Sequence, residues 1–404
     1  MESQTRRRFK LSHLVPGWLV LFTLGHFSHH LLTALPVPLL PFIRDSFSLD
    51  YTLSGLLLSV FSITYGLSQL PSGWLADRLG SRILMTAGIC GVGLCGILIG
   101  LTPGYVMLLI LMGLMGLLGG GYHPSAPPLV SSTVAPRERG RAIGVHAIGG
   151  SASYFIAPLI AAATAAAWGW RSSFLILAAP TLGFGILLYF MLSRLKSRQP
   201  VTNTSDGCAI VPRKARDRRE LTAFMALSSA ATIVITSVVS FIPLLLVDHL
   251  SMSQESAALI ITVIYFTGIF ANPLAGFISD RVGRIPLLVF ACLALVPVLY
   301  LMTVMGSGWA VDSLLVAIGI IIALTQTSSE SHIVGSVAED KCSSVLGVYY
   351  FINMTGAGIV TPALGALIDN RGIHFSLTLT AIIMAAATLA YCSWLLRRRR
   401  LKTA

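Results

Sequence analysis

The charged stretch GWLADRLGSR, residues 73–82, lies in the first half of the chain, and GFISDRVGRI, residues 276–285, lies in the second half. Both read Gly-x-x-x-Asp-Arg-x-Gly, and the second begins 203 residues after the first. Each copy places a carboxylate and a guanidinium between two long hydrophobic runs. A motif that is repeated in this way predicts a chain built from two copies of one structural unit.

Charged residues are scarce outside such islands. They make up 11% of the 404 residues, and the mean hydropathy is +0.80. About 20 apolar residues suffice to cross the hydrocarbon core as a helix. We therefore predict an all-α polytopic membrane protein with twelve transmembrane helices. The predicted spans are 15–43, 50–72, 83–101, 105–134, 142–166, 172–193, 222–248, 255–278, 286–306, 309–335, 344–368 and 374–396.

The basic residues indicate how these spans are oriented. With both termini in the cytoplasm, all of the 28 Lys and Arg residues except Arg44, Arg171 and Arg371 fall on the cytoplasmic side. Positive charge is enriched in cytoplasmic loops. The distribution predicts a multi-pass protein of the cell inner membrane with cytoplasmic N- and C-termini. Topology also accounts for the net charge of +12, so we expect no nucleic-acid partner.

The stretch 195–220 is polar and basic and contains Pro, Gly and Ser, which is typical of an exposed linker. Six predicted spans precede it and six follow it. We expect an N-terminal six-helix bundle at 1–194, a cytoplasmic linker at 195–220 and a C-terminal six-helix bundle at 221–404. The two bundles should be pseudo-symmetric, because the motif occurs at matching places in both.

The repeated motif also suggests a contact between the halves. Its glycines suit tight turns and close helix approach, and its carboxylates can accept from a helix N-terminus or pair with arginine. A solvated turn is the simpler interpretation. Repetition at matching places favours a conformational latch that closes the cytoplasmic side, formed by Gly73, Asp77, Arg78, Gly80, Gly276, Asp280, Arg281 and Gly283.

With twelve spans, a basic central linker and both motif copies, the chain resembles the major facilitator superfamily over essentially its whole length. GWLADRLGSR resembles the superfamily's signature between spans 2 and 3, and GFISDRVGRI resembles its second-half copy. The resemblance implies a central cavity lined by spans 1, 4, 7 and 10, and transport by rocker-switch alternating access.

Span 5, GVHAIGGSASYFIAPLIAAA, resembles a weakened form of the superfamily's antiporter signature. Gly144, Gly150 and Pro158 would then lie on an interface or gating helix. Generic packing of small residues between membrane helices is the alternative.

Two other stretches are similar to the fosmidomycin-resistance branch of the superfamily. HFSHHLL in span 1 matches at Ser28 and His29, and GGGYHPSAPP in span 4 matches at His123 and Pro124. This resemblance implies proton-driven efflux of a drug or an organic anion.

Ionisable residues inside a bilayer are costly, so each is a candidate for function. Glu330 is the acidic residue that falls well inside a predicted span, and three histidines crowd into span 1. We predict proton coupling at Glu330, His26, His29 and His30. The alternatives are neutral histidines that satisfy backbone carbonyls, and a carboxylate at the membrane interface that pairs with Arg137 or Arg139.

The substrate-binding candidates are His123, Tyr122, Gln326 and Ser28. Glycines and prolines around His123 weaken its helix and expose backbone polar groups, which is tolerated only beside protein or a wet cavity. Gln326 corresponds to His123 at the 203-residue offset. His146 is interpreted as structural.

These observations favour a secondary transporter that exports a small organic compound or drug by proton antiport. Proton-coupled uptake of a small organic anion, export of a metal or metal chelate at the histidines, and a receptor that no longer transports are the alternatives. The six cysteines form no CxxC pair, and no Walker motif is present. We expect no cofactor, no resident metal and no enzymatic activity. The expected partners are a small-molecule substrate, protons and membrane lipid, and the expected state is a monomer.

Overall fold

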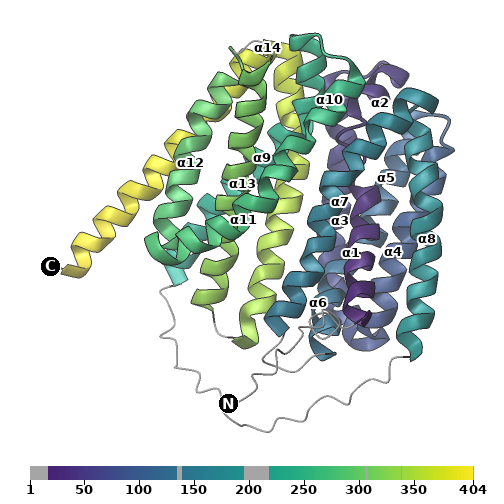
Figure 1. Cartoon of the computed structure of the whole chain (residues 1–404). Helices are drawn as coiled ribbons and strands as arrows, with labels where there is room; N and C mark the ends of the chain where they lie inside the picture. The colour runs from purple at the N-terminus through teal and green to yellow at the C-terminus, as the bar shows by residue number, and fades with distance from the viewer. Residues whose placement is uncertain (1–16, 134–138, 195–217, 305–307, 338, 404) are drawn as a thin grey trace, which may run out of the picture.

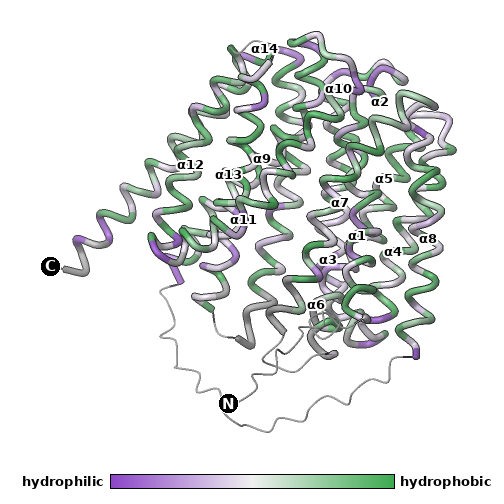
Figure 2. Tube along the Cα trace, viewed as in Figure 1, coloured by the Kyte–Doolittle hydropathy of each residue, from purple (hydrophilic) through white to green (hydrophobic). Residues whose placement is uncertain are grey.

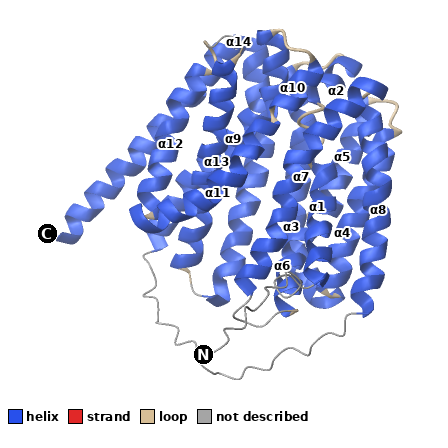
Figure 3. Cartoon of the chain, in the orientation of Figure 1, coloured by secondary structure: helices blue, strands red, loops and turns tan. Residues whose placement is uncertain are grey.

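A computed structural model of the chain describes residues 17–133, 139–194, 218–304, 308–337 and 339–403, and these residues form helices and short connections without a strand (Figure 3). The helices are α1 (Gly17–Thr33), α2 (Leu40–Phe47), α3 (Tyr51–Leu79), α4 (Ser81–Gly100), α5 (Tyr105–Gly119), α6 (Tyr122–Ser132), α7 (Arg139–Trp168), α8 (Trp170–Arg194), α9 (Arg218–Leu250), α10 (Gln254–Ile260), α11 (Thr262–Val282), α12 (Arg284–Leu301), α13 (Trp309–Ser336) and α14 (Glu339–Thr403).

The helices form two bundles that stand side by side, α1–α8 and α9–α14 (Figure 1). We call the end where α8 stops and α9 starts the linker face, and the opposite end, with α2 and α10, the far face. The predicted linker 195–220 lies outside the described residues apart from 218–220, which begin α9. The arrangement confirms the predicted fold class, an all-α polytopic membrane protein with two six-helix bundles.

Ten stretches of the described residues are long and apolar enough to cross a membrane. The last, Val345–Arg398, is 54 residues long. The backbone leaves helical geometry at Gly372 inside it, so it supplies two crossings. The remaining crossing begins with α1, of which 17 residues are described. Hydrophobic residues run along most of each helix, and hydrophilic residues gather near the helix ends (Figure 2). Exposed apolar side chains such as Val106 and Phe190 suit contact with lipid.

Three of the predicted spans are broken within the structure. The span 15–43 ends as a helix at Thr33, and a separate α2 starts at Leu40, because prolines in between remove backbone donors. The span 105–134 divides into α5 and α6 at Gly120 and Gly121. The span 255–278 divides into α10 and α11 at Ile261, and no Gly or Pro at that position signalled the break.

The repeated motif is mostly helical, not a turn as its composition suggested. Residues 73–78 form the last turns of α3 and residues 276–281 those of α11, so only the final glycine of each copy breaks the helix. Gly80 has φ 90° and Gly283 has φ 96°, a conformation that favours glycine in both copies. The two bundles are therefore alike down to the backbone angles of this junction.

Candidate functional site

Five histidines come together inside the α1–α8 bundle, and we call them the histidine cluster: His26, His29, His30, His123 and His146. The first three lie on α1, His123 on α6 and His146 on α7. The break between α5 and α6 starts a new helix at Tyr122, which directs His123 towards α1. The cluster therefore depends on three helices that are distant in sequence.

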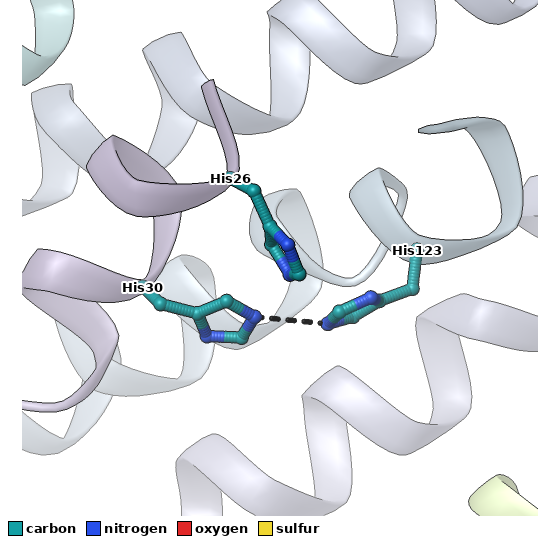
Figure 4. A group of neighbouring side chains, drawn as sticks. All are labelled: His26, His30 and His123. Atoms are coloured by element: carbon teal, nitrogen blue, oxygen red, sulfur yellow. Dashed lines mark hydrogen bonds between the residues drawn. The ribbon is translucent and has the colours of Figure 1, made fainter. Parts of the chain in front are cut away.

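His30 and His123 are joined directly. Their Nε2 atoms are 3.2 Å apart, so one ring donates and the other accepts (Figure 4). The ring of His26 packs beside both, with ring-centre distances of 4.9 Å to His30 and 5.6 Å to His123. The ligand nitrogens of these three residues all lie within 4.8 Å of one another. Three imidazoles thus face a common point.

Backbone carbonyls set the tautomers of two rings. The carbonyl of His146 accepts from His26 Nδ1 at 2.9 Å, and the carbonyl of Phe22 accepts from His146 Nδ1 at 3.1 Å. A carbonyl only accepts, so each Nδ1 carries the hydrogen and each neutral ring keeps a lone pair on Nε2. The two rings are stacked with centres 4.4 Å apart. His146 is therefore both a tie between α7 and α1, as the sequence suggested, and a member of the cluster.

His29 lies beside these rings, with its ring centre 5.0 Å from that of His30 and 6.1 Å from that of His123. Its ring stacks on Tyr122 with centres 4.5 Å apart, and its Nε2 is 3.2 Å from the hydroxyl of Tyr65 on α3. His29 Nδ1 and the Tyr122 hydroxyl are buried and have no hydrogen-bond partner among the described residues. Buried polar atoms without a partner are uncommon and costly. The cluster therefore keeps hydrogen-bonding capacity that the described protein atoms do not use.

Gly150 makes room for the ring of His26. A Cβ atom at this position would lie 2.8 Å from His26 Cε1 and 2.9 Å from His26 Nε2, closer than side chains approach. In the predicted gating helix α7, Gly150 therefore allows close packing against α1 of the same bundle. Pro158 is buried in α7, and the side chain position of Gly144 lies outside the described residues.

We expect Gly150→Val to displace His26 and break its bond to the His146 carbonyl. Overpacking costs about 1–3 kcal/mol, and the lost hydrogen bond adds about 1 kcal/mol. The midpoint of thermal unfolding in detergent should therefore fall by several degrees. Ala147→Val is the matched control, because Ala147 lies on the same helix and is exposed. Equal midpoints for the two variants would contradict the role of Gly150.

The second bundle carries its own polar group around Glu330 on α13. The Tyr350 hydroxyl donates to Glu330 Oε1 at 2.8 Å, and Gln326 Nε2 donates to the same oxygen at 3.3 Å. Gln326 is exposed, whereas Glu330 is half-buried. Tyr349, the residue before Tyr350, is hydrogen-bonded through its hydroxyl to that of Ser228 on α9 at 2.6 Å. Glu330 is thus held between its own helix and α14.

Not all predicted site residues meet. The structure brings His123 and Tyr122 to the span-1 histidines, but among the described residues no hydrogen bond, ion pair or ring contact joins Glu330 to them. Ser28 is half-buried and takes no part in the described contacts of the cluster. Proton uptake at His26, His29 and His30 stays a prediction, as does binding at Ser28.

Aromatic residues that the sequence reading missed connect the cluster to its surroundings. The ring of Tyr154 lies 5.2 Å from His30 and 5.3 Å from Tyr265 on α11, which belongs to the other bundle. Tyr65 bonds His29 from α3. A tyrosine in an apolar span resembles any core aromatic residue, so no pattern distinguished these two. Tyr154 places the cluster near the junction of the bundles.

The predicted latch does not join the bundles through the side chains that the structure describes. Arg78 stacks on Trp74 at 4.1 Å, and Arg281 stacks on Phe277 at 4.0 Å, each on its own helix. The side chains of Asp77 and Asp280 lie outside the described residues. A latch on the linker face therefore stays a prediction, for a conformation in which that face is closed.

The bundles are joined by polar contacts at the far face. Asp248 on α9 accepts from Arg44 Nη1 at 2.5 Å and from the Tyr51 hydroxyl at 2.7 Å. Asp369 on α14 accepts from the backbone N–H groups of Tyr51 at 3.0 Å and Thr52 at 2.8 Å. Burial lowers the pKa of Arg44, but its hydrogen bonds and charge interactions with Asp248 and Asp45 together outweigh this, so the net pKa lies above the usual value. The structure thus has a closed far face.

Two membrane-embedded helical bundles, joined at one face and carrying polar groups near their junction, define the class of secondary transporters. The family model of the Major Facilitator Superfamily matches residues 22–361. The chain belongs to this superfamily.

Known proteins resemble the chain in sequence and in fold. It is 28% identical over 361 residues to multidrug resistance protein MdtG of Escherichia coli, covering 85% of each chain. A solved bacterial homologue of the human lysosomal transporter Spinster, in an inward-facing and occupied conformation, superposes with a TM-score of 0.75 at 17% identity, covering 97% of both chains. A POT family transporter in complex with a thioalcohol conjugated peptide gives a TM-score of 0.80 at 14% identity, covering 94% of this chain and 96% of that one. These two structures support the fold.

Proposed function

We propose that this transporter exports a small organic compound in exchange for protons. Its similarity to proteins named for multidrug resistance supports export. One observation carries the proton coupling: the carboxylate of Glu330 lies in a membrane-crossing helix and is held there by hydrogen bonds from Tyr350 and Gln326. Ionisable groups inside membrane spans are costly and are typical of proton pathways.

Glu330 is linked to the bundle junction through α14. Tyr350 belongs to α14, the same helix whose Gly358 carbonyl accepts from the Ser59 hydroxyl on α3 of the other bundle. An ionised carboxylate accepts only, whereas the protonated acid also donates. Protonation of Glu330 therefore weakens its bond from Tyr350 and loosens one of the contacts between α13 and α14. A proton bound at Glu330 thereby biases how the bundles sit against each other, which is what coupling requires.

The histidine cluster serves as the ligand-binding part of the α1–α8 bundle in this proposal. His123 and Gln326 occupy corresponding positions of the two halves, so each bundle presents one polar group. His123 and Tyr122 come from the broken helix, and Tyr154 extends the group towards α11. Substrate that enters while the far face is closed contacts both bundles and leaves once the far face opens.

We further propose that the linker face is cytoplasmic and that the protein is a monomer of the inner membrane with the domain limits 1–194, 195–220 and 221–404. Support comes from the basic residues near that face, such as Arg78, Arg82 and Arg281, because positive charge marks the cytoplasmic side. Cysteines placed at either face and labelled in whole cells with an impermeant maleimide test this orientation.

Proton flux in reconstituted vesicles tests the function. Vesicles carrying an internal pH dye receive a panel of drugs and organic anions under an imposed proton gradient. We expect wild-type protein to move protons when a substrate is added and Glu330→Gln to move none above protein-free vesicles, because the amide cannot bind the proton. Asp312→Asn is the matched control, a carboxylate that lies exposed in the first turn of the same helix.

Two results would contradict the proposal. Proton movement by Glu330→Gln at the wild-type rate would remove the coupling site, although export would stand. Wild-type protein that accumulates a compound with the gradient, instead of expelling it, would establish uptake. Tyr350→Phe removes a hydrogen bond that positions Glu330 but keeps its carboxylate. This variant should slow the substrate-coupled proton movement without abolishing it.

A further inference from the structure

Three of the five clustered histidines share the geometry of a metal site. His26, His30 and His123 each offer one ring nitrogen, and the three nitrogens lie within 4.8 Å of one another (Figure 4). Imidazole is a good ligand for Zn²⁺ and other transition metals. Zinc binds histidine nitrogen at about 2.0–2.1 Å in a tetrahedron, which places two such nitrogens roughly 3.3 Å apart. The Nε2 atoms of His30 and His123 are 3.2 Å apart and match that edge.

The surrounding hydrogen bonds orient these rings as they do in metal proteins. Ligating histidines usually donate their other N–H to a carbonyl or hydroxyl. His26 Nδ1 donates to the His146 carbonyl at 2.9 Å, so the lone pair of the ring is on Nε2. The Thr33 hydroxyl lies 3.4 Å from the carbonyl of His30 and donates to it, so the Thr33 oxygen accepts from His30 Nδ1 at 3.2 Å. Two lone pairs therefore face the common point.

His123 becomes the third ligand by a change of tautomer. With the His30 lone pair facing it, His123 Nε2 carries the hydrogen of the bond between them. Moving that hydrogen to Nδ1 frees Nε2 for a metal, and the ring charge does not change. His26 must approach by up to about 1.5 Å to complete the three-ligand face of a tetrahedron. His26 and His123 are partly exposed, which gives an ion a way in.

We propose that His26, His30 and His123 form a binding site for a transition-metal ion such as Zn²⁺, with the fourth coordination position open to an anionic group of a bound compound. The three ligands are neutral, and the metal-binding group formed by the described residues includes neither a carboxylate nor a thiolate. A divalent charge at this depth needs compensation. An anion on the fourth position supplies it, so a metal chelate of an organic anion fits the site better than the bare ion does.

Metal binding by purified full-length protein tests this directly and does not depend on transport. The protein carries a tag without histidine and is dialysed to equilibrium against ZnCl₂ in detergent. We expect one Zn²⁺ per chain. The affinity should fall by more than about 100-fold in His26→Gln, His30→Gln or His123→Gln, beyond the range for loss of an outer-shell partner. MgCl₂ should not bind, because Mg²⁺ prefers oxygen ligands.

His374→Gln is the matched control, because it removes an exposed histidine at the far face, away from the cluster, and it should keep the wild-type affinity. His146→Gln removes a ring that stacks on His26 but keeps the backbone carbonyl that orients it. Its affinity should fall by less than that of any of the three ligand variants. Thermal unfolding verifies that each variant is folded, and His123→Gln on α6 stands in if an α1 variant is not. The proposal is overturned if wild-type protein binds no Zn²⁺, or if folded variants of the three ligands bind it as tightly as wild type.

The Co²⁺-loaded protein tests the open position. Metal geometry is diagnostic of the ligand set. We expect the visible spectrum of tetrahedral Co²⁺, and we expect added thiocyanate to shift it. An octahedral spectrum would count against three histidine ligands with one open position, and a tetrahedral spectrum that ignores thiocyanate would count against the anionic fourth ligand. Neither result bears on Glu330, so a failure here leaves proton-coupled export standing.

Discussion

Replacing Gly55 by leucine is expected to abolish transport while both bundles stay folded. Gly55 lies one turn inside α3 at the far face, where the bundles touch. A Cβ atom at this position would lie 2.9 Å from Pro362 Cα on α14 and 3.0 Å from Phe241 Cζ on α9. The backbone of Pro362 cannot rotate away as a side chain could. Overpacking costs about 1–3 kcal/mol and more against backbone, which disfavours the closed far face by about 100-fold.

The separation of the bundles can be measured with spin labels at exposed positions of the far face, Val106 in one bundle and Arg371 in the other. Pulsed EPR should show a longer distance in Gly55→Leu than in wild type, in a background without native cysteines. Gly183→Leu is the matched control, because a Cβ atom there meets nothing within 4 Å. An unchanged distance with full transport would show that closure does not need the close approach at Gly55.

Asp248→Ala should open the far face by removing its central acceptor. The carboxylate holds Arg44 and Tyr51 at once, at 2.5 and 2.7 Å. Hydrogen bonds to charged groups contribute about 1.5–3 kcal/mol each. The side chain of Asp248 is 28% exposed, which argues for the low end of that range. Solvent screening of this partly exposed group lowers the combined contribution of the two bonds to about 2 kcal/mol, and its loss shifts the population towards the open form about 30-fold.

The rate of labelling of a far-face cysteine by an impermeant maleimide should rise accordingly. Tyr51→Phe removes one of the two bonds and should have a smaller effect. A double-mutant cycle with Arg44→Ala isolates the ion pair. If Arg44→Ala changes the labelling rate as much in the Asp248→Ala background as in wild type, the two groups do not stabilise the closed face together. Unlike the effect at Gly55, this one should weaken in high salt.

The membrane fold of this chain could be predicted from its sequence because membrane insertion depends on local composition. Each long apolar run must form a helix to satisfy its own backbone, wherever it later packs. The repeat of Gly73–Arg78 at Gly276–Arg281 likewise needed no knowledge of contacts. The positions at which helices break within the spans were harder to predict. Glycines indicated the break between α5 and α6, but no residue pattern indicated the break at Ile261.

The residue types of the candidate site could also be predicted, since polar groups stand out in apolar spans. The residues with which they form hydrogen bonds and ring contacts could not. Which face of α1 meets α6 and α7 depends on how the helices rotate and cross, and that is set by packing of small residues such as Gly150 against His26. The sequence alone therefore determined a two-bundle membrane protein with histidines and a carboxylate in its spans. Only the tertiary structure decided that His30 meets His123 and that Glu330 bonds to Tyr350, because these contacts depend on the relative positions of separate helices.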